Sequence, residues 1–346
     1  MYYAGIDYHK RYSFVSIQNE AGEIKLEYQI PGNHPHLFEE AFGRMKGEVA
    51  VVYEASFNWG WLYEVLEGMV NVKSITVANP YKVRLIAETQ IKTDKLDARK
   101  LALLLRLGVV PECHVPDRQT RARKEVLRQR AYWVRQRTGI RNRVHRIIGR
   151  QHGLQMPQVS DLFGAKGKAA LHKAVLPEPD NMLLRQNLEM LDNLDKVIRL
   201  DEAQIKAEGR QDRAVEIAAS VPGIGLVIGS IIATETDGVQ RFLGPERYTG
   251  YCGLSPSTHS SGGKTYHGRM MWQCNKWLKW AFIEAAWIAV GCSSYFGGFY
   301  RYHRGRGKQA NTAITLVARR MGRIIYQLLM EDRLYEERNF SPAALI

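Results

Sequence analysis

The chain has few cysteines and few acids for its length. Its 346 residues include four cysteines, and 35 acidic residues stand against 49 lysines and arginines, which gives a formal net charge of +14. The cysteines lie far apart and form no Cys-x-x-Cys pair. This spacing argues against a zinc module and against a disulfide framework, and it favours reduced thiols in a cytosolic protein.

Long apolar runs are also missing. The most apolar stretch, at residues 277–291, contains Lys279 and Glu284 and is too short to cross a bilayer. The first ten residues show no basic region followed by an apolar run, so we expect no signal peptide. The apolar stretch is therefore expected to be a buried helix, and no membrane partner is expected.

The excess of positive charge is concentrated in one segment. Residues 117–150 are strongly basic, and their apolar residues recur at three- and four-residue spacing, which predicts a long amphipathic helix with a cationic face. A polyanion such as nucleic acid is the simplest partner, because phosphate contacts release counterions. The candidate nucleic-acid contacts in this segment are Arg121, Arg123, Lys124, Arg128, Arg135, Arg137, Arg141 and Arg143.

The patterning predicts three domains, at residues 1–112, 113–210 and 211–346, and the fold class α/β plus α. The apolar pattern of the first domain predicts strands at Tyr2–Gln18 (broken into shorter pieces), Lys25–Ile30, Val49–Glu54 and Val72–Val77. Helical spacing of apolar residues predicts helices at 34–45 and 59–69. An opening antiparallel meander is compatible with an RNase-H-like fold. Parallel α/β alternatives stay open.

The second domain is expected to be a helical arm. After the basic helix, residues 151–180 are rich in Gly, Pro and Lys and predict a hinge or irregular tip. A second long helix follows at 181–206, with leucines and an isoleucine near heptad spacing. We therefore predict an antiparallel coiled-coil arm; the alternative is two ordinary core helices.

Four carboxylates are the strongest candidates for a metal site. Asp7 follows Gly5-Ile6 in the first strand, Glu54 ends a later strand, and Asp94 and Asp97 are three residues apart, so a helix places both on one face. Several carboxylate ligands are what two-metal phosphodiester chemistry needs. Taken singly, each acid also fits a structural role; Asp94 and Asp97, for example, suit the start of a helix.

Two glycine-containing segments occur in the third domain, which is expected to be mostly helical. Residues 221–235 resemble a helix-hairpin-helix, in which Gly223 and Gly225 would let backbone amides approach a phosphate. A loop-rich stretch is expected from Asp237 to His267, and it contains Ser260 and Ser261 before two glycines. Lys264 and Arg269 follow as candidate phosphate contacts. A serine beside glycines and cations suits a nucleophile, although such a string is more often only a flexible loop.

These segments together resemble the DEDD transposases of bacterial insertion sequences, which are related to Piv-type DNA invertases and include bridge-RNA-guided recombinases. The resemblance covers nearly the whole chain. It rests on GIDYHK, VVYEAS and KTDKLDARKLA in the first half, and on VPGIG and RFLGPERYTGYCGLSPSTHSSGGKTYHGR in the second. The chain departs from the family at Cys274, where members often carry glycine before Asn275, and at residues 270–273, which replace a basic stretch.

The resemblance implies a RuvC-like domain that binds Mg²⁺ through Asp7, Glu54, Asp94 and Asp97. It also implies a C-terminal transposase domain with a catalytic serine, Ser261 (Ser260 is the second choice), that forms a covalent phosphoserine link to DNA. The implied partners are donor and target double-stranded DNA, a noncoding bridge RNA, and further copies of the chain in a dimer or tetramer. The implied location is the bacterial cytoplasm, at the nucleoid. The alternatives are a RuvC-like nuclease that only hydrolyses strands and a non-enzymatic architectural binder of DNA or RNA.

Overall fold

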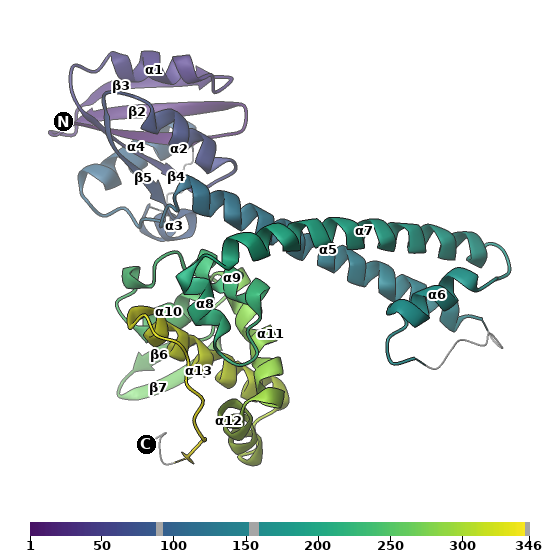
Figure 1. Cartoon of the computed structure of the whole chain (residues 1–346). Helices are drawn as coiled ribbons and strands as arrows, with labels where there is room; N and C mark the ends of the chain where they lie inside the picture. Colours follow the sequence, from purple (N-terminus) through teal and green to yellow (C-terminus); the bar gives the residue numbers. More distant parts are fainter. Residues whose placement is uncertain (88–92, 152–158, 343–346) are drawn as a thin grey trace. The chain divides into compact units, whose positions relative to one another are not determined.

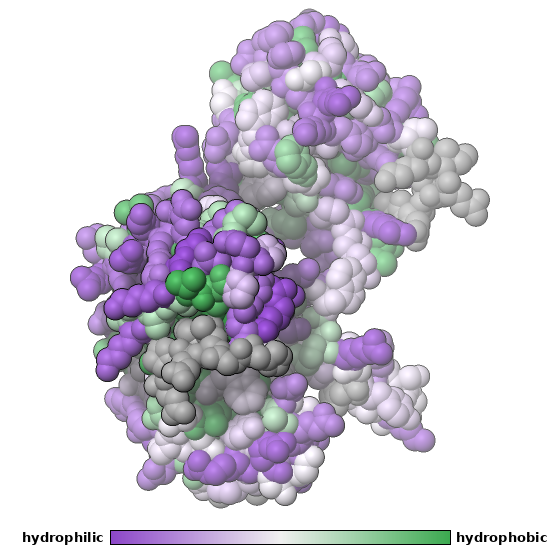
Figure 2. Space-filling view, turned by 90° about the vertical axis from the view of Figure 1, so that its right-hand side faces the viewer, coloured by the Kyte–Doolittle hydropathy of each residue, from purple (hydrophilic) through white to green (hydrophobic). Residues whose placement is uncertain are grey.

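The computed structural model describes residues 1–87, 93–151 and 159–342, which form two compact units, residues 1–116 and 117–346 (Figure 1). All four cysteines are free thiols. The face of the molecule shown in Figure 2 is mostly hydrophilic, with hydrophobic residues in small scattered patches. None of the helices in the described part of the chain is both long and apolar enough to span a bilayer.

The first unit is built on a five-stranded mixed sheet. Its strands are β1 (Tyr2–Tyr8), β2 (Tyr12–Asn19), β3 (Ile24–Pro31), β4 (Val49–Glu54) and β5 (Val72–Ala78), in the order β3-β2-β1-β4-β5. The first three strands are antiparallel, whereas β4 pairs in parallel with β1 and β5. The predicted meander is confirmed and a wholly parallel sheet is excluded. The arrangement is compatible with a nuclease-like domain of the RNase H kind.

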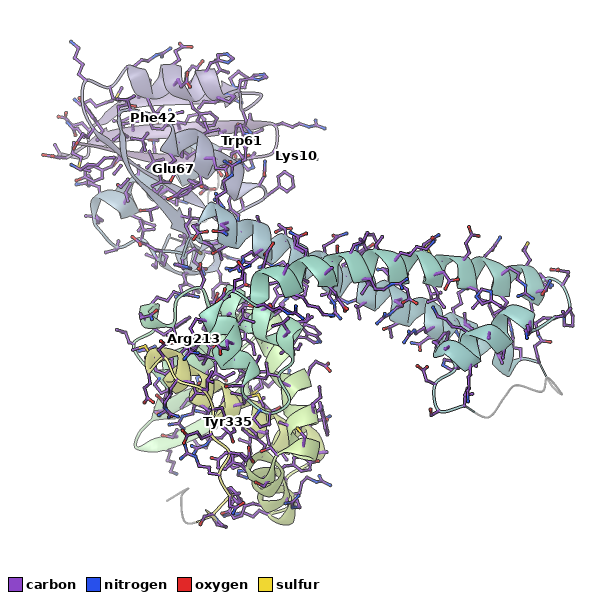
Figure 3. The ribbon with its side chains drawn as sticks, in the orientation of Figure 1. Lys10, Phe42, Trp61, Glu67, Arg213 and Tyr335 are labelled. Carbon is purple, nitrogen blue, oxygen red and sulfur yellow. The ribbon has the colours of Figure 1, made fainter. Side chains whose placement is uncertain are left out.

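Alternation along β4 separates two apolar layers. Tyr53 packs on one face of the sheet with residues of α1 (Pro35–Gly43) and α2 (Trp59–Glu67); Phe42 and Trp61 of this layer are labelled in Figure 3. Val52 packs on the opposite face with residues of α3 (Pro80–Ala87) and α4 (Asp94–Arg106). Because side chains alternate, Glu54 lies on the face that carries α4.

Gly5 is the position at which α4 comes closest to the sheet. A Cβ atom at Gly5 would lie 2.1 Å from the carbonyl oxygen of Ala98 and 2.5 Å from the amide nitrogen of Ala102. Only glycine therefore fits beneath this helix. Since β1 alternates with a period of two, Asp7 points to the same face as Gly5, toward the first turn of α4.

The second unit begins with two long helices, α5 (Arg118–Gly149) and α7 (Asp180–Gly209), which pack along each other. Ion pairs fix their direction. Arg123 pairs with Glu208 (3.2 Å), Arg130 with Glu202 (2.6 Å), and Arg137 with Asp195 (3.2 Å). Arginines that come later along α5 pair with acids that come earlier along α7. The two helices are therefore antiparallel, as predicted. That they form a coiled coil stays a prediction.

The two ends of this helix pair belong to different apolar cores. Leu127 and Ile205 join the core of the C-terminal part, whereas Val144 and Leu184 pack with α6 (Ala165–Lys173) at the other end. The prediction of a hinge or irregular tip at 151–180 was wrong for residues 165–173, which form a short helix that buries Leu171. Residues 152–158 of that segment lie outside the described residues.

The rest of the unit is mostly helical, as predicted. Its elements are α8 (Arg213–Ala219), α9 (Leu226–Thr236), a 3-10 turn η1 (Val239–Arg241), α10 (Pro245–Tyr251), β6 (Pro256–Ser261), β7 (Lys264–Met270), α11 (Lys276–Cys292), α12 (Ser294–Gly305) and α13 (Ala310–Met330). The apolar stretch predicted as a buried helix is α11. One of its sides is buried, including Phe282 and Ala285, while Trp287 and Ile288 are exposed.

The segment after α13 is tied back to α8 and the turn that follows it. Arg213, labelled in Figure 3, forms an ion pair of 3.0 Å with Asp332. The backbone amide of Tyr335, also labelled there, donates to the Ser220 hydroxyl at 2.9 Å. These contacts hold the C-terminal segment against the helical core.

Candidate functional site

The carboxylates of the first unit lie at one end of the sheet. The last paired residues of the parallel strands β1 and β4 are Ile6 and Tyr53, so Asp7 and Glu54 follow at the same edge and on the same face. The carboxyl ends of neighbouring parallel strands are a common place for ligand-binding side chains. The sheet therefore brings together two acids that are 47 positions apart in the sequence.

The start of α4 supplies the other two acids. Thr93 caps this helix, and its hydroxyl accepts a hydrogen bond from the Leu96 amide at 3.2 Å. The cap begins the helix just before Asp94, so Asp94 and Asp97 both lie in the first turn. Acids are stabilised there by the helix dipole. Asp97 also forms a 3.1 Å ion pair with Lys100.

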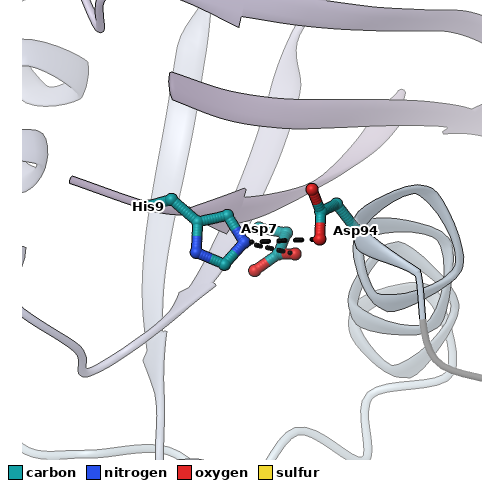
Figure 4. Close-up of side chains that lie close together, drawn as sticks. All are labelled: Asp7, His9 and Asp94. Atoms are coloured by element: carbon teal, nitrogen blue, oxygen red, sulfur yellow. Dashed lines mark hydrogen bonds and ion pairs between the residues drawn. The ribbon is translucent and has the colours of Figure 1, made fainter. Parts of the chain in front are cut away.

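Three side chains converge closely enough to share one cation (Figure 4). One ligand atom from each of Asp7, His9 and Asp94 lies within 4.8 Å of the other two. The His9 Nε2 atom is 3.1 Å from Asp7 Oδ2 and 3.5 Å from Asp94 Oδ1. Glu54 and Asp97, which were predicted ligands, do not belong to this close group.

The electrostatics of Asp7 favour a cation in this place. Burial raises the pKa of the Asp7 carboxyl above its ordinary value, and the neighbouring charges of Asp94 and Asp97 raise it further, while His9 opposes the shift. A charged carboxylate in such surroundings is stabilised when a cation lies beside it. The donor set therefore fits the divalent metal that the predicted chemistry requires.

The predicted serine loop is a β-hairpin, which corrects the expectation of a loop-rich stretch. Ser261 and Lys264 face each other across β6 and β7, joined by Gly262 and Gly263 with φ angles of +57° and +77°. Positive φ at both central residues is the requirement of a tight two-residue turn. The serine lies next to this turn, on regular strand backbone.

The two candidate nucleophiles differ in their surroundings. The Ser260 hydroxyl is 2.9 Å from the Thr265 hydroxyl across the hairpin. The Ser261 side chain is exposed and forms no hydrogen bond with the part of the chain that the structure describes. Lys264 and Arg269 are exposed on the same hairpin. The structure therefore leaves Ser261 the more available hydroxyl; that it is the nucleophile stays a prediction.

The two glycines of the predicted helix-hairpin-helix occupy different positions between α8 and α9. Gly223 has a φ of +87°, and a Cβ atom there would lie 2.4 Å from the carbonyl oxygen of Ala285 in α11. Packing against α11 is thus enough to require glycine. Gly225 precedes α9 and is exposed, with nothing near its Cβ position. A phosphate contact at these glycines stays a prediction.

Several of the predicted nucleic-acid contacts have partners within the protein. Arg123 and Arg137 pair with acids of α7, and Arg141 lies over the Phe163 ring at 5.0 Å. Arg121 is partly buried, whereas Arg135 and Arg143 are exposed. Arg143 lines one pocket together with Arg146 and Arg150. The exposed residues are therefore the better candidates for phosphate contacts.

Lys124 and Arg128 both point toward a buried acid, Glu235 of α9. Glu235 is 3% exposed, and its Oε1 accepts a 2.9 Å hydrogen bond from Arg128, while Lys124 Nζ lies 3.9 Å from Oε2. Burial lowers the pKa of the Lys124 ammonium group, against the effect of Glu235. Asn275, which caps α11, donates to Glu235 Oε2 at 3.0 Å. These contacts connect α5 with α9 and with Asn275, which lies between the β6–β7 hairpin and α11.

Comparisons with known proteins agree with this arrangement. Residues 4–150 match the family of DEDD transposases of the IS110 type, and residues 215–301 match the transposase IS116/IS110/IS902 family. The first match spans the sheet, α4 and α5, and the second spans the serine hairpin. The chain belongs to the DEDD transposases of the IS110 type.

Individual relatives extend over much of the chain. A probable family 20 transposase of Pseudomonas aeruginosa is 26% identical over 74% of this chain and 79% of its own length. A putative transposase of Sinorhizobium fredii, y4qE, is 23% identical over 81% of this chain and 75% of its own length. An uncharacterized protein of insertion element IS116 from Streptomyces clavuligerus is 27% identical over 41% of this chain, and the alignment covers 36% of that protein.

The family matches support an insertion-sequence transposase, an enzyme that acts on DNA. Transposases of this family typically depend on a divalent metal. Sequence reasoning missed His9 as a member of the close group. The local signal for it was weak: His9 lies two residues after Asp7, but just beyond the end of β1.

Proposed function

We propose that this transposase cleaves and rejoins DNA through a serine nucleophile and a Mg²⁺-binding carboxylate set. The observation that carries the proposal is that Asp7 and Asp94 lie close together at the end of the sheet. The pKa of the Asp7 carboxyl is raised there, and a bound cation would lower it by stabilising the carboxylate. Glu54 and Asp97 belong to the same set through their positions at this edge and in the first turn of α4. When bound, Mg²⁺ supplies electrophilic stabilisation of charge on the reacting phosphate.

Ser261 is the proposed nucleophile. The Oγ loses its proton and attacks the phosphorus of the scissile phosphodiester. An O–P bond forms, and the bond to the leaving deoxyribose oxygen breaks as that oxygen takes up a proton in exchange. The phosphoserine ester keeps the energy of the broken bond, so a hydroxyl of another strand can reverse the step and join the DNA. The exposure of Ser261 next to the tight turn, with Lys264 opposite, supports this role.

The substrates of the proposed reaction are donor and target double-stranded DNA, selected by a noncoding bridge RNA. RNA guidance rests on the family resemblance. The exposed arginines of α5 support a contact with the backbone of RNA or DNA. Contacts with backbone phosphates depend on positive charge and do not read the base sequence. A dimer or tetramer at the bacterial nucleoid completes the proposal.

A covalent-trap assay tests the serine. The protein, produced with the noncoding DNA that flanks its gene, is mixed with labelled junction DNA and Mg²⁺ and run on a denaturing gel. We expect a protein–DNA band that disappears in Ser261→Ala and persists in Ser260→Ala. Sequencing of the RNA that copurifies with the protein tests the guide.

Other outcomes separate the alternatives. Cleaved DNA without a covalent band, unchanged in Ser261→Ala, would establish a hydrolytic RuvC-like nuclease. Binding without cleavage, unchanged in Asp97→Ala, would establish an architectural binder. Wild-type recombination by Ser261→Ala would refute the serine mechanism while leaving the carboxylate site in place.

A further inference from the structure

His9 occupies the space between two carboxylates that are predicted to bind metal. Its Nε2 atom is 3.1 Å from Asp7 Oδ2 and 3.5 Å from Asp94 Oδ1 (Figure 4). The side chain is 44% exposed, so burial does not force it into this position. The imidazole nitrogen is directed at the place where a cation would contact both acids.

The backbone that carries His9 is fixed by a buried asparagine. Asn33 is 8% exposed, and its Nδ2 donates to the His9 carbonyl oxygen at 2.7 Å. Its Oδ1 accepts a 2.7 Å hydrogen bond from the Ser13 hydroxyl. The His9 amide also donates to the Tyr12 carbonyl oxygen at 3.0 Å, which closes the turn between β1 and β2. The backbone position of His9 is therefore set by the fold before any ligand arrives.

Tyr12 orients the second carboxylate of the group. Its hydroxyl donates to Asp94 Oδ2 at 2.8 Å, which leaves Oδ1 as the oxygen facing His9. The Tyr12 ring also lies beside the His9 ring, with centroids 5.1 Å apart. Outer partners of this kind commonly fix the orientation of metal ligands. One nitrogen and two oxygens are thus arranged toward a common point.

We propose that His9 is a metal ligand, so that one cation is held by His9 Nε2, Asp7 and Asp94. This inference rests on the metal site of the proposed function and adds a nitrogen to a set that was expected to contain only oxygen. Imidazole is a common ligand of transition metals, and among these Mn²⁺ shares with Mg²⁺ a preference for carboxylates. Mg²⁺ itself keeps oxygen ligands and several waters. The site is therefore expected to bind Mn²⁺ more tightly than Mg²⁺.

Pulsed electron paramagnetic resonance of bound Mn²⁺ tests the proposal without measuring activity. A directly bound imidazole nitrogen modulates the electron spin echo of Mn²⁺. The full-length protein is loaded with Mn²⁺ alone, with natural histidine or with ¹⁵N-histidine. We expect ¹⁴N modulation in the wild type that changes to the ¹⁵N pattern on labelling. We expect the same modulation in His36→Ala, which removes an exposed histidine of the same unit.

His9→Ala should abolish the nitrogen modulation. It should weaken Mn²⁺ binding by at least about tenfold, the lower end of the loss seen for outer partners of metal ligands, and weaken Mg²⁺ binding less. Asp7→Asn tests whether the bound Mn²⁺ lies at this site. If it does, this variant should no longer bind Mn²⁺.

Each contrary result has a distinct meaning. Mn²⁺ that depends on Asp7 but shows no nitrogen modulation would overturn the role of His9 and leave the carboxylate site standing. Modulation that persists in His9→Ala would also overturn it, since the nitrogen would come from elsewhere. Mn²⁺ binding that does not depend on Asp7 would overturn both this inference and the metal site of the proposed function.

Discussion

Gly5 of β1 lies directly beneath Ala98 of α4, so close that a Cβ atom at Gly5 would be 2.1 Å from the Ala98 carbonyl oxygen. The same helix carries Asp94 and Asp97 in its first turn, and the same strand carries Asp7 two residues later. The distance between strand and helix therefore sets the distance between the acids.

Gly5→Ala is expected to disturb the site without touching an acid. The new methyl group must push α4 outward, which typically costs about 1–3 kcal/mol of stability. The displacement separates Asp94 from Asp7, so Mn²⁺ affinity should fall as well. Gly43→Ala is the control, because nothing lies within 4 Å of its Cβ position; equal effects of the two changes on Mn²⁺ titration would refute this explanation.

Glu27 should contribute to the pH dependence of the stability of the first unit. Its carboxylate on β3 binds Arg99 and Lys95 of α4, and these partners, above all the hydrogen bond from Arg99, hold its pKa below the ordinary value. A carboxyl with a lowered folded-state pKa stabilises the fold above its unfolded pKa, and this contribution is lost as the pH falls through the folded value.

Glu27→Gln should therefore be less stable than the wild type at pH 7, and the difference should shrink as the pH falls below the ordinary pKa of 4.5. Urea unfolding at pH 7 and pH 3 measures this change. Glu40→Gln is the matched control, since the pair that Glu40 forms with Arg44 is exposed. A constant difference across the pH range would contradict the prediction.

The arginines of α5 should divide into two functional groups. Arg130 is bound to Glu202 through two nitrogens, at 2.6 and 3.2 Å, so Arg130→Gln should lower stability and leave the salt dependence of nucleic-acid binding unchanged. Arg135 and Arg143 are exposed. Replacing both by Gln should reduce the slope of log affinity against log salt by about 0.9 for each phosphate that the protein no longer neutralises.

The salt titration is decisive for the assignment of the binding face. A reduced slope in Arg130→Gln with no change in the double variant would place the nucleic acid elsewhere. A charge swap that combines Arg130→Glu with Glu202→Arg should restore the stability lost in either single variant, since it rebuilds the pair in reverse.

Glu235→Ala should be among the most destabilising single changes of the second unit. It leaves Arg128 and Lys124 without the buried acid that they share, and breaking a buried ion pair costs about 3–5 kcal/mol. Glu125 pairs with the same Arg128 at 3.8 Å but is 79% exposed. Glu125→Ala should therefore cost about 0.5 kcal/mol or less in the same chemical unfolding experiment.

Much of the first unit could be predicted from the sequence because its information is local. A continuous apolar run that ends in a carboxylate predicts the bounds of β4, and the threonine before Asp94 marks the start of α4. His9 was missed because its approach to Asp94 depends on the turn that Asn33 holds from a distant part of the chain. The family resemblance identified the four acids, but only the fold shows which of them lie close together.

Two features of the second unit were not predicted from the sequence. The prediction of a loop around Ser261 was wrong although two glycines separate the runs that pair, which is a signal for a tight turn.

The pattern of α5 predicts a free cationic face because one helix alone does not tell which acids of another helix face it. Arg123, Arg130 and Arg137 are seven residues apart, and this repeat marks a helix-to-helix interface rather than a surface for nucleic acid.

The paired helices α5 and α7 also have a mechanical consequence. Ion pairs along their length resist sliding, and at 1.5 Å per residue the 32 residues of α5 extend about 48 Å. A rotation of one degree about Leu127, toward the first end of α5, therefore moves the α6 end of the helix, 22 residues and about 33 Å away, by about 0.6 Å. Since Arg128 and Glu235 join that first end to the cap of α11, a partner that tilts the far end would apply torque to the base of the serine hairpin.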